Sequence, residues 1–315
     1  MCLRWFSGER ETWGTQVNER KPRLDGSAIA LLLLCCAIWG TSQVATKVAL
    51  GEVPPLLQAG LRSLGAFILV AWWSRARGVS LDWRDGTAPA GVLTGLLFAA
   101  EFACVFIGLQ FTSASRIVVF IYLAPFVVAL GMPWVAGSER LRPVQMVGLL
   151  AAFSGVAWAF SEGFEGPEAG RWQWLGDALG VVGALLWGAT TLVIRGSQLA
   201  SAAPEKTLLY QLAASALLLP LASLAAGEVW PHRVSAGILG LLLFQIVVVC
   251  SFSYLAWFWL VRHYPATQLS AFTMITPLLG LLAGVLLLGE PLTLRLVLAG
   301  IAVAAGMVLV NRRAH

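Results

Sequence analysis

Two residues of opposite charge, Arg62 and Glu101, lie deep inside long apolar segments of the chain. Glu101 is the only carboxylate that the sequence reading places well inside such a segment. In hydrocarbon a charged side chain costs at least about 2.5 to 3.5 kcal/mol, so each one needs a reason. An arginine there can attract a carboxylate, and a glutamate can attract an ammonium group or carry a coupling proton. The alternative is a structural role, in which the charges join helices as a buried ion pair.

Depth along the apolar segments suggests which residues accompany this pair. Counting 1.5 Å per helical residue from the turns that end the segments places several polar side chains at similar depths, well inside the segments. We expect them to form a polar layer that can bind a solute. Its expected members are Gln43, Arg62, Glu101 and Tyr122.

Two further basic residues, Lys47 and Arg116, lie closer to the ends of their segments. Long basic side chains at such positions can extend toward the surface. Depth alone does not favour contact between Glu101 and Arg116. The sequence leaves open whether Glu101 pairs with Arg62, with Arg116 or with neither.

Aromatic residues and prolines supply the remaining candidate site residues. Large aromatic side chains at the centres of apolar segments can line a cavity, or they can pack against the neighbouring Gly40 and Gly188. Prolines inside apolar segments remove a helical hydrogen bond and permit a bend, which predicts gating positions. The candidates for the cavity are Trp39, Trp187, Tyr254 and Trp257, and those for bends are Pro125 and Pro277.

The composition identifies the elements that must position these residues. Of the 315 residues, 58% are hydrophobic and 12% are charged, whereas a soluble domain is about half apolar and about a quarter charged. Apolar runs of about 20 residues, long enough to cross a bilayer as helices, occur ten times. The sequence therefore predicts an all-α integral membrane protein. The expected spans are 27–49, 55–74, 88–110, 113–136, 143–161, 175–196, 204–225, 234–260, 266–288 and 292–311.

The second half of the chain repeats features of the first at an offset of about 150 residues, as in many transporters. Trp39–Gly40 with Lys47 returns as Trp187–Gly188 with Arg195. Each copy holds five expected spans, and because five is odd the copies must be inverted in the membrane. The expected domains are a cytoplasmic tail at 1–26, a first repeat at 27–161, an outer loop at 162–174, a second repeat at 175–311 and a cytoplasmic tail at 312–315.

The basic residues of the loops indicate orientation. With the amino terminus in the cytoplasm, almost all of them fall on the cytoplasmic side, as the positive-inside rule requires. We therefore expect a multi-pass protein of the inner (plasma) membrane with both termini cytoplasmic. The same distribution explains the net charge of +5 as a topology signal and argues against nucleic-acid binding.

Enzyme and metal signatures are missing from the sequence. It contains no HExxH, GxSxG or phosphate-binding glycine loop. The histidines and cysteines do not have the spacing of metal ligands. We expect neither catalysis nor a cofactor nor a metal.

Paired motifs resemble the EamA-type branch of the drug/metabolite transporter superfamily. The first block runs from Leu109 through Arg116 and Pro125 to Leu141, and the second from Val261 through Gln268 and Pro277 to Pro291. The resemblance covers nearly the whole chain from about residue 30. It implies ten helices in two inverted five-helix repeats around a central cavity, with export of amino acids, related metabolites or drugs as the usual activity.

The residues and the resemblance together predict a secondary active transporter that exports a small polar or zwitterionic metabolite or a drug by alternating access. In this hypothesis Arg62 attracts a carboxylate, and Glu101 attracts an ammonium group or couples transport to protons. A non-transporting membrane sensor or scaffold is the alternative, and it would need no cavity open to water. The expected partners are a small-molecule substrate and the lipid bilayer, and a homodimer is compatible with the sequence.

Overall fold

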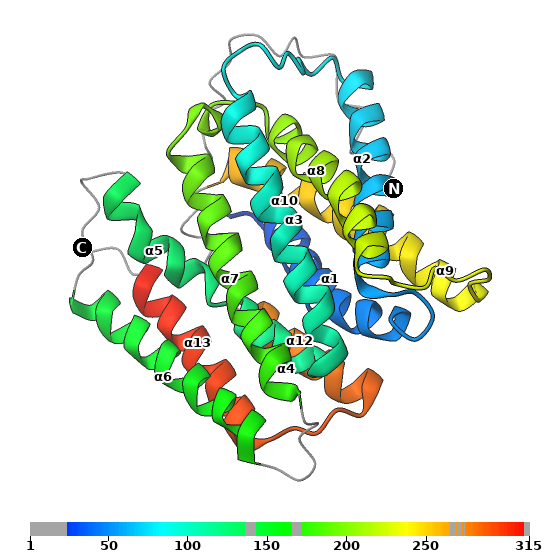
Figure 1. Ribbon diagram of the computed structural model, residues 1–315. Helices are drawn as coiled ribbons and strands as arrows, with labels where there is room; N and C mark the ends of the chain where they lie inside the picture. Colours follow the sequence, from blue (N-terminus) through cyan, green and yellow to red (C-terminus); the bar gives the residue numbers. More distant parts are fainter. Residues whose placement is uncertain are drawn as a thin grey trace.

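The computed structural model describes residues 24–135, 143–165, 172–264, 269, 273 and 275–311. The described residues of the first half form α1 (Gly26–Ala49), α2 (Pro55–Ala76), α3 (Ala88–Phe111), α4 (Ala114–Ile121), α5 (Ala124–Val135) and α6 (Pro143–Glu165). Those of the second half form α7 (Gln173–Arg195), the short η2 (Gln198–Ala200), α8 (Pro204–Ala225), α9 (Ala236–Leu243), η3 (Phe244–Ser253), α10 (Tyr254–His263), α12 (Ile275–Leu288) and α13 (Leu294–Asn311). Figure 1 shows these helices as an elongated bundle.

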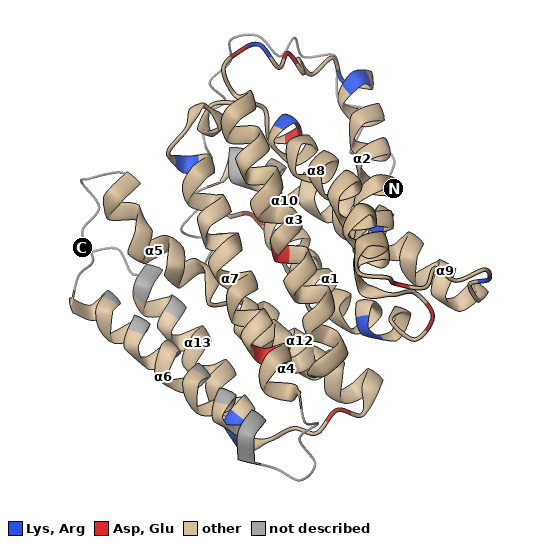
Figure 2. Ribbon diagram, in the orientation of Figure 1, with Lys and Arg blue, Asp and Glu red and all other residues tan. Residues whose placement is uncertain are grey.

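Many of these helices are suited to a bilayer by length and composition. Seven stretches are long and apolar enough to cross a membrane, and three further apolar helices are shorter. Figure 2 shows that charged residues gather mainly at helix ends and in loops, with few along the middle of the bundle. The seven long stretches are Gly26–Ala49, Pro55–Ala76, Ala88–Phe111, Ala114–Val135, Gln173–Arg195, Pro204–Ala225 and Ala236–Trp257, and the shorter ones are Met146–Ala159, Ile275–Leu288 and Leu294–Gly306.

The two halves of the chain interleave in the bundle. Helix α1, from the first half, packs against η3, α10 and α12 of the second. Conversely α7, from the second half, packs against α3, α4 and α5 of the first. We call these sets the α1 group (α1, η3, α10 and α12) and the α7 group (α7, α3, α4 and α5). The remaining pairs, α2 with α8 and α6 with α13, also combine one helix from each half.

Glycines allow the close helix contacts within each group. A Cβ atom at Gly40 of α1 would lie 2.8 Å from the backbone N of Gly280 on α12. A Cβ atom at Gly188 of α7 would lie 2.6 Å from the Cβ of Val127 on α5. Small residues bring membrane helices together in this way because lipid supplies no hydrophobic force between them. The repeated Trp–Gly sequence thus marks a helix contact in both halves.

The ends of α2 and α8 show the same construction twice. Each helix is followed by a glycine with positive φ, Gly78 at 66° and Gly227 at 70°, a conformation that favours glycine. Glu228, just past α8, accepts hydrogen bonds of 3.1 Å from two backbone N–H groups in the first turn of α2. Lys206, in the first turn of α8, donates at 2.5 Å to Asp85 in the loop between α2 and α3. The residue after α8 therefore caps the start of α2, and the start of α8 is tied to the loop that follows α2.

Two spans are less regular than the sequence analysis expected. The expected single span 113–136 is interrupted at Tyr122 and Leu123, between α4 and α5. Pro125, the expected bend, is the second residue of α5, where its missing N–H costs no helical hydrogen bond. The expected span 234–260 contains the π-helix η3, which no sequence pattern indicated. Pro277 is the third residue of α12, and residues 270–272 and 274 before it lie outside the described residues.

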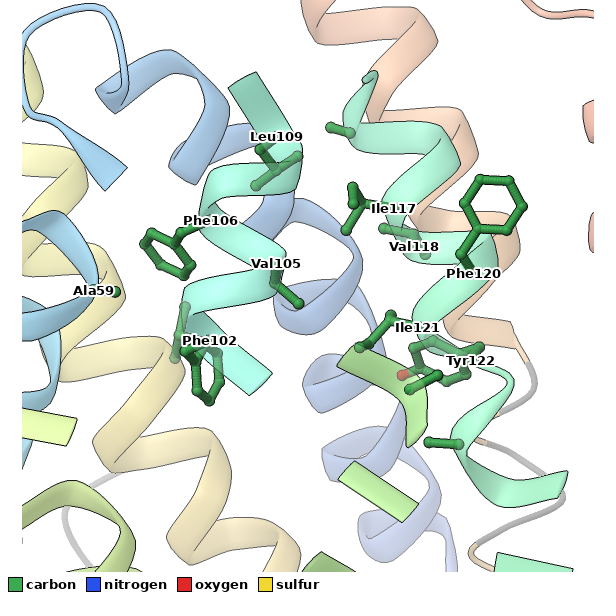
Figure 3. Close-up of a cluster of buried hydrophobic side chains, with 14 of the residues drawn as sticks. Ala59, Phe102, Val105, Phe106, Leu109, Ile117, Val118, Phe120, Ile121 and Tyr122 are labelled. Atoms are coloured by element: carbon green, nitrogen blue, oxygen red, sulfur yellow. The ribbon is translucent and has the colours of Figure 1, made fainter. Parts of the chain in front are cut away.

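The buried apolar core lies where α3 and α4 face each other and α3 faces α2. Figure 3 shows Phe106 directed from α3 toward Ala59 of α2. It also shows Val105 and Ile121 directed into the space between α3 and α4. This core forms the apolar surroundings of the charged residues that the sequence singled out.

Candidate functional site

Arg62 and Glu101 are both buried in the middle of their helices. Arg62 on α2 is 4% exposed and Glu101 on α3 is 6% exposed. The guanidinium carbon of Arg62 lies 3.9 Å from the centre of the Phe102 ring and 4.9 Å from that of Phe106. Such cation–π contacts lower the cost of burying the arginine but leave its N–H groups available for hydrogen bonds.

The two charges attract each other without forming a close ion pair. Arg62 acts electrostatically on the Glu101 carboxyl, yet their N and O atoms do not come within the 4.0 Å that defines an ion pair. Nε and Nη2 of Arg62 and Oε2 of Glu101 are buried without hydrogen-bond partners in the described part of the chain. Buried polar atoms in proteins are nearly always partnered, and leaving them unpartnered is costly. These atoms are therefore the strongest candidates for contact with a solute.

A tyrosine from the other half of the chain completes this centre. Tyr254, the first residue of α10, interacts electrostatically with both Arg62 and Glu101. Tyr122, which follows α4, lies close enough to Tyr254 for electrostatic coupling. Three of the four expected layer members thus lie near Tyr254. Gln43 on α1 is the fourth, and its Oε1 is buried without a hydrogen-bond partner.

The aromatic candidates form two contacts. The rings of Trp39 and Trp257 meet edge to face at 5.5 Å, and Nε1 of Trp39 donates a 2.8 Å hydrogen bond to Oγ of Ser253. The rings of Tyr122 and Trp187 meet edge to face at 5.8 Å. All four aromatic candidates from the sequence, Tyr254 included, are half-buried and lie on the α1 or α7 group.

A second buried polar cluster lies one helical turn from Arg62 on α2. Nε2 of Gln58 donates to the backbone O of Thr46 at 3.3 Å, and Oγ1 of Thr46 lies 3.4 Å from Oε1 of Gln245 on η3. Gln58 and Gln245 are fully buried, and each keeps one amide atom without a partner in the described part of the chain. π-Helices are frequent at functional sites. This cluster was not predicted from the sequence, because a single uncharged glutamine in an apolar segment carries no distinctive pattern.

Arg116 is paired with a residue that the sequence analysis missed. Its Nη2 lies 2.6 Å from Oδ2 of Asp177 on α7, and its Nε lies 3.0 Å from Oδ1. Oγ1 of Thr112 donates to the same carboxylate at 2.6 Å, and Nη2 of Arg116 also donates to the backbone O of Ala159 at 2.6 Å. Arg116 therefore does not pair with Glu101.

Asp177 is a second buried carboxylate, near one end of its span, that was not among the residues predicted from the sequence. It is fully buried in the second turn of α7. The sequence analysis passed over it because it stands near the start of an apolar run. Asp25, the N-cap of α1, makes a similar contact about one helical turn from the equivalent position, where it accepts a 2.8 Å hydrogen bond from Oη of Tyr264, the equivalent of Thr112.

Among the described residues, no group of three or more His, Cys, Asp or Glu side chains is arranged to hold a metal ion. The chemistry of the centre is instead that of opposite charges, hydroxyl groups and aromatic rings.

Comparison with known proteins identifies the family. The model of the EamA-like transporter family matches residues 26–161 and again 174–312. The chain is 27% identical over 295 residues to the uncharacterized transporter YvbV of Bacillus subtilis strain 168, covering 92% of this chain and 94% of that protein. It is 24% identical over 285 residues to a protein of Escherichia coli strain K12 named "Probable amino-acid metabolite efflux pump", covering 86% of this chain and 89% of the other.

One solved structure, a crystal structure of a protein, shares the fold. It superposes with a TM-score of 0.65 at 22% sequence identity and covers 90% of this chain and 97% of its own. The family match spans both halves, and the membrane-spanning helices agree with it. The chain is therefore a multi-pass membrane protein and a transporter, not an enzyme, and it belongs to the EamA-like transporter family.

Proposed function

We propose that this protein is a secondary active transporter that moves a small zwitterionic metabolite, such as an amino acid or a related compound, out of the cell by alternating access. One observation carries the proposal: Arg62 and Glu101 are buried, opposite in charge and incompletely hydrogen-bonded. A zwitterion presents a carboxylate and an ammonium group a short distance apart. It can therefore supply the missing hydrogen-bond partners of Arg62 and Glu101 at the same time. The efflux-pump name of the Escherichia coli relative supports the same class of substrate.

The proposed architecture is ten transmembrane helices in two inverted five-helix repeats, 27–161 and 175–311, with both termini cytoplasmic in the plasma membrane. The seven long and three shorter apolar helices support the number. The interleaved α1 and α7 groups and the matching positive-φ glycines after α2 and α8 support the repeat relation. Topology reporters fused to each end test the orientation, and reporters that read opposite sides of the membrane would refute it.

Each residue of the centre has a role in this proposal. Arg62 binds the carboxylate of the substrate, because a guanidinium group offers donors in a geometry that matches two carboxylate oxygens. Glu101 binds the ammonium group or carries a coupling proton. Tyr122, Tyr254, Gln43 and the tryptophans Trp39, Trp187 and Trp257 shape the space around the substrate, and the break before Pro125 and the region of Pro277 allow the helices to bend.

Substrate exchange in proteoliposomes tests the binding role of Arg62. Vesicles loaded with unlabelled amino acids should accumulate a labelled one, and Arg62→Gln should reduce this exchange at least about tenfold because a charge-assisted contact is lost. Arg77→Gln is the matched control, since Arg77 caps the same helix in an exposed position. Exchange that survives in Arg62→Gln, or no exchange of any zwitterion by the unmodified protein, would refute the proposal.

A second experiment separates the two roles of Glu101. If Glu101 carries a coupling proton, Glu101→Gln should abolish uptake driven by a proton gradient into inverted vesicles while exchange without a gradient continues. If both modes are lost equally, Glu101 binds the substrate or supports the structure and does not couple protons.

A further inference from the structure

Lys47 reaches from one helix group to the other. It stands near the end of α1, and its Nζ donates a 3.1 Å hydrogen bond to the backbone O of Leu109 and a second, short one to the backbone O of Thr112. These carbonyl groups end α3, where helical carbonyls lack partners within the helix and carry partial negative charge. The half-buried lysine thus joins the α1 group to the α7 group.

Glu290 makes a second connection at the same end of the bundle. It follows α12, and its carboxylate accepts hydrogen bonds from the backbone N of Ala114 at 2.7 Å, the backbone N of Ser115 at 3.0 Å and Oγ of Ser115 at 2.6 Å. It therefore caps the start of α4 and complements its dipole. Glu290 also attracts Lys47 electrostatically, so the two connections form one network.

The seam below this network is tightly closed. A Cβ atom at Gly280 of α12 would lie 2.6 Å from Cγ1 of Val118 on α4, and Val118 is buried. A Cβ atom at Gly284 would lie 2.1 Å from Oγ of Ser115. Figure 1 shows α4 beside α12 at this end of the bundle. The α1 and α7 groups are thus in direct contact here.

The opposite end differs at the equivalent position. Arg195 stands eight residues after Trp187, as Lys47 does after Trp39, and the equivalents of Leu109 and Thr112 are Val261 and Tyr264. Arg195 is exposed, and among the described residues it makes no hydrogen bond or ion pair. The contact that Lys47 makes at one end is therefore not made by Arg195 at the other. Glu139, the equivalent of Glu290, lies outside the described residues.

Contacts within each group do not show this difference. The hydrogen bond from Thr112 to Asp177 within the α7 group has a counterpart in the bond from Tyr264, the equivalent of Thr112, to Asp25 at the start of α1, and both are formed. Contacts inside the groups are thus made at both ends, whereas the lysine or arginine contact between the groups is made at only one. This is the pattern expected of two rigid bodies that approach each other at one end at a time.

We propose that Lys47 and Arg195 are alternating gate residues, each of which closes one end of the transporter by capping the carbonyl end of the helix across the seam. Lys47, assisted by Glu290, closes the end that carries the α3–α4 turn, which is the outer end in the proposed orientation. Arg195 closes the cytoplasmic end after the α1 and α7 groups have moved. The inference rests on the proposed alternating access and adds the residues that hold each state.

A cysteine in the seam tests the assignment without any substrate. Val118→Cys is introduced into a protein whose natural cysteines at 2, 35, 36, 104 and 250 are replaced, and intact cells are treated with a membrane-impermeant maleimide. The cysteine should react slowly in this background. Lys47→Ala should raise its rate of labelling at least about tenfold, because the closed outer end loses its stabilising contact. Lys47→Arg should restore protection.

Arg195→Ala is the matched control, since it removes the equivalent residue at the other end. It should leave labelling of Val118→Cys unchanged or make it slower, because only the state closed at the cytoplasmic end is weakened. Glu290→Gln should increase labelling as Lys47→Ala does, and it replaces that variant if Lys47→Ala does not fold. Labelling that stays slow in the folded variants, or that rises equally in Arg195→Ala, would overturn the gate assignment. Exchange activity of the unmodified protein is measured separately, so a failure of the gate is distinguished from a failure of the transport proposal.

Discussion

The protein buries two arginine–carboxylate combinations in very different ways. Arg116 and Asp177 are paired through several hydrogen bonds, and Thr112 adds another to the same carboxylate. Arg62 and Glu101 are buried as deeply, yet their side chains keep unpartnered polar atoms and stay beyond ion-pair distance. Because a buried charge is tolerated only when it is well compensated, the first combination supports the structure and the second one reduces stability. A costly arrangement of this kind is typical of a functional site.

The second half of the chain shows how the fold is built without the unsatisfied pair. The equivalents of Arg62 and Glu101 are Tyr210 and Ser253. Tyr210 packs its ring against Gly91 and places its Oη 3.3 Å from Oγ1 of Thr87. Oγ of Ser253 accepts from Trp39 and donates to the backbone O of Val249. The neutral equivalents are therefore well satisfied, which indicates that the charges in the first half serve a purpose other than packing.

The largest expected effect is on the paired combination. Asp177→Asn should lower the free energy of unfolding by roughly 3 to 5 kcal/mol, because it removes the carboxylate charge that pairs with the buried Arg116 guanidinium. Unfolding of the purified protein in detergent, followed by temperature or denaturant, measures the change. Adding Arg116→Gln to the same protein should recover part of the loss. If Asp177→Asn alone is as stable as the parent, the pair of Arg116 and Asp177 does not stabilise the fold.

A smaller effect is expected at the contact of Gly91 with Tyr210, the residue of the second half that is equivalent to Arg62. A Cβ atom at Gly91 would lie 2.5 Å from Cδ2 of Tyr210, so Gly91→Ala should force this ring to move and cost about 1 to 3 kcal/mol. Gly237→Ala is the control, because a Cβ atom there has no neighbour within 4 Å. Thermal unfolding of both variants in detergent measures the difference. Equal stability of the two would show that the Tyr210 contact is loose.

The unsatisfied combination should behave in the opposite manner to Asp177. Glu101→Gln should change the free energy of unfolding by no more than about 1 kcal/mol and can raise it, because the carboxyl already lacks a full set of partners. The same unfolding assay as for Asp177→Asn gives the value. A loss as large as that of Asp177→Asn would mean that Glu101 is a structural acid and that the comparison between the two combinations is wrong.

The sequence identified the unsatisfied combination more readily than the satisfied one. Arg62 and Glu101 interrupt the middle of apolar runs, and depth counting placed Tyr122 near Glu101. Side-chain partners depend on which helices pack together, so the pairing of Arg116 with Asp177 became visible only from the contact of α4 with α7.

The apolar helices could be predicted from the sequence because hydropathy depends on length and composition alone. The break at Tyr122 and the π-helix η3 depend on backbone hydrogen bonding, which composition does not encode.

The smallest effect is expected from a third pair of opposite charges, in which the buried Lys206 meets the exposed carboxylate of Asp85. Hydrogen bonds from Lys206 and Thr87 lower the pKa of Asp85 from 3.8 to about 2. The carboxylate is favoured in the folded state, so its stabilising effect is present above pH 3.8 and is lost as the pH falls through about 2. Thermal unfolding between pH 5 and pH 2 should therefore depend on pH less in Asp85→Asn than in the parent. Because the Asp85 carboxylate is exposed to water, which screens its attraction to Lys206, the difference should be well below that caused by Asp177→Asn. If the stability of Asp85→Asn depends on pH as much as that of the parent, or more, Asp85 does not contribute to stability in this way.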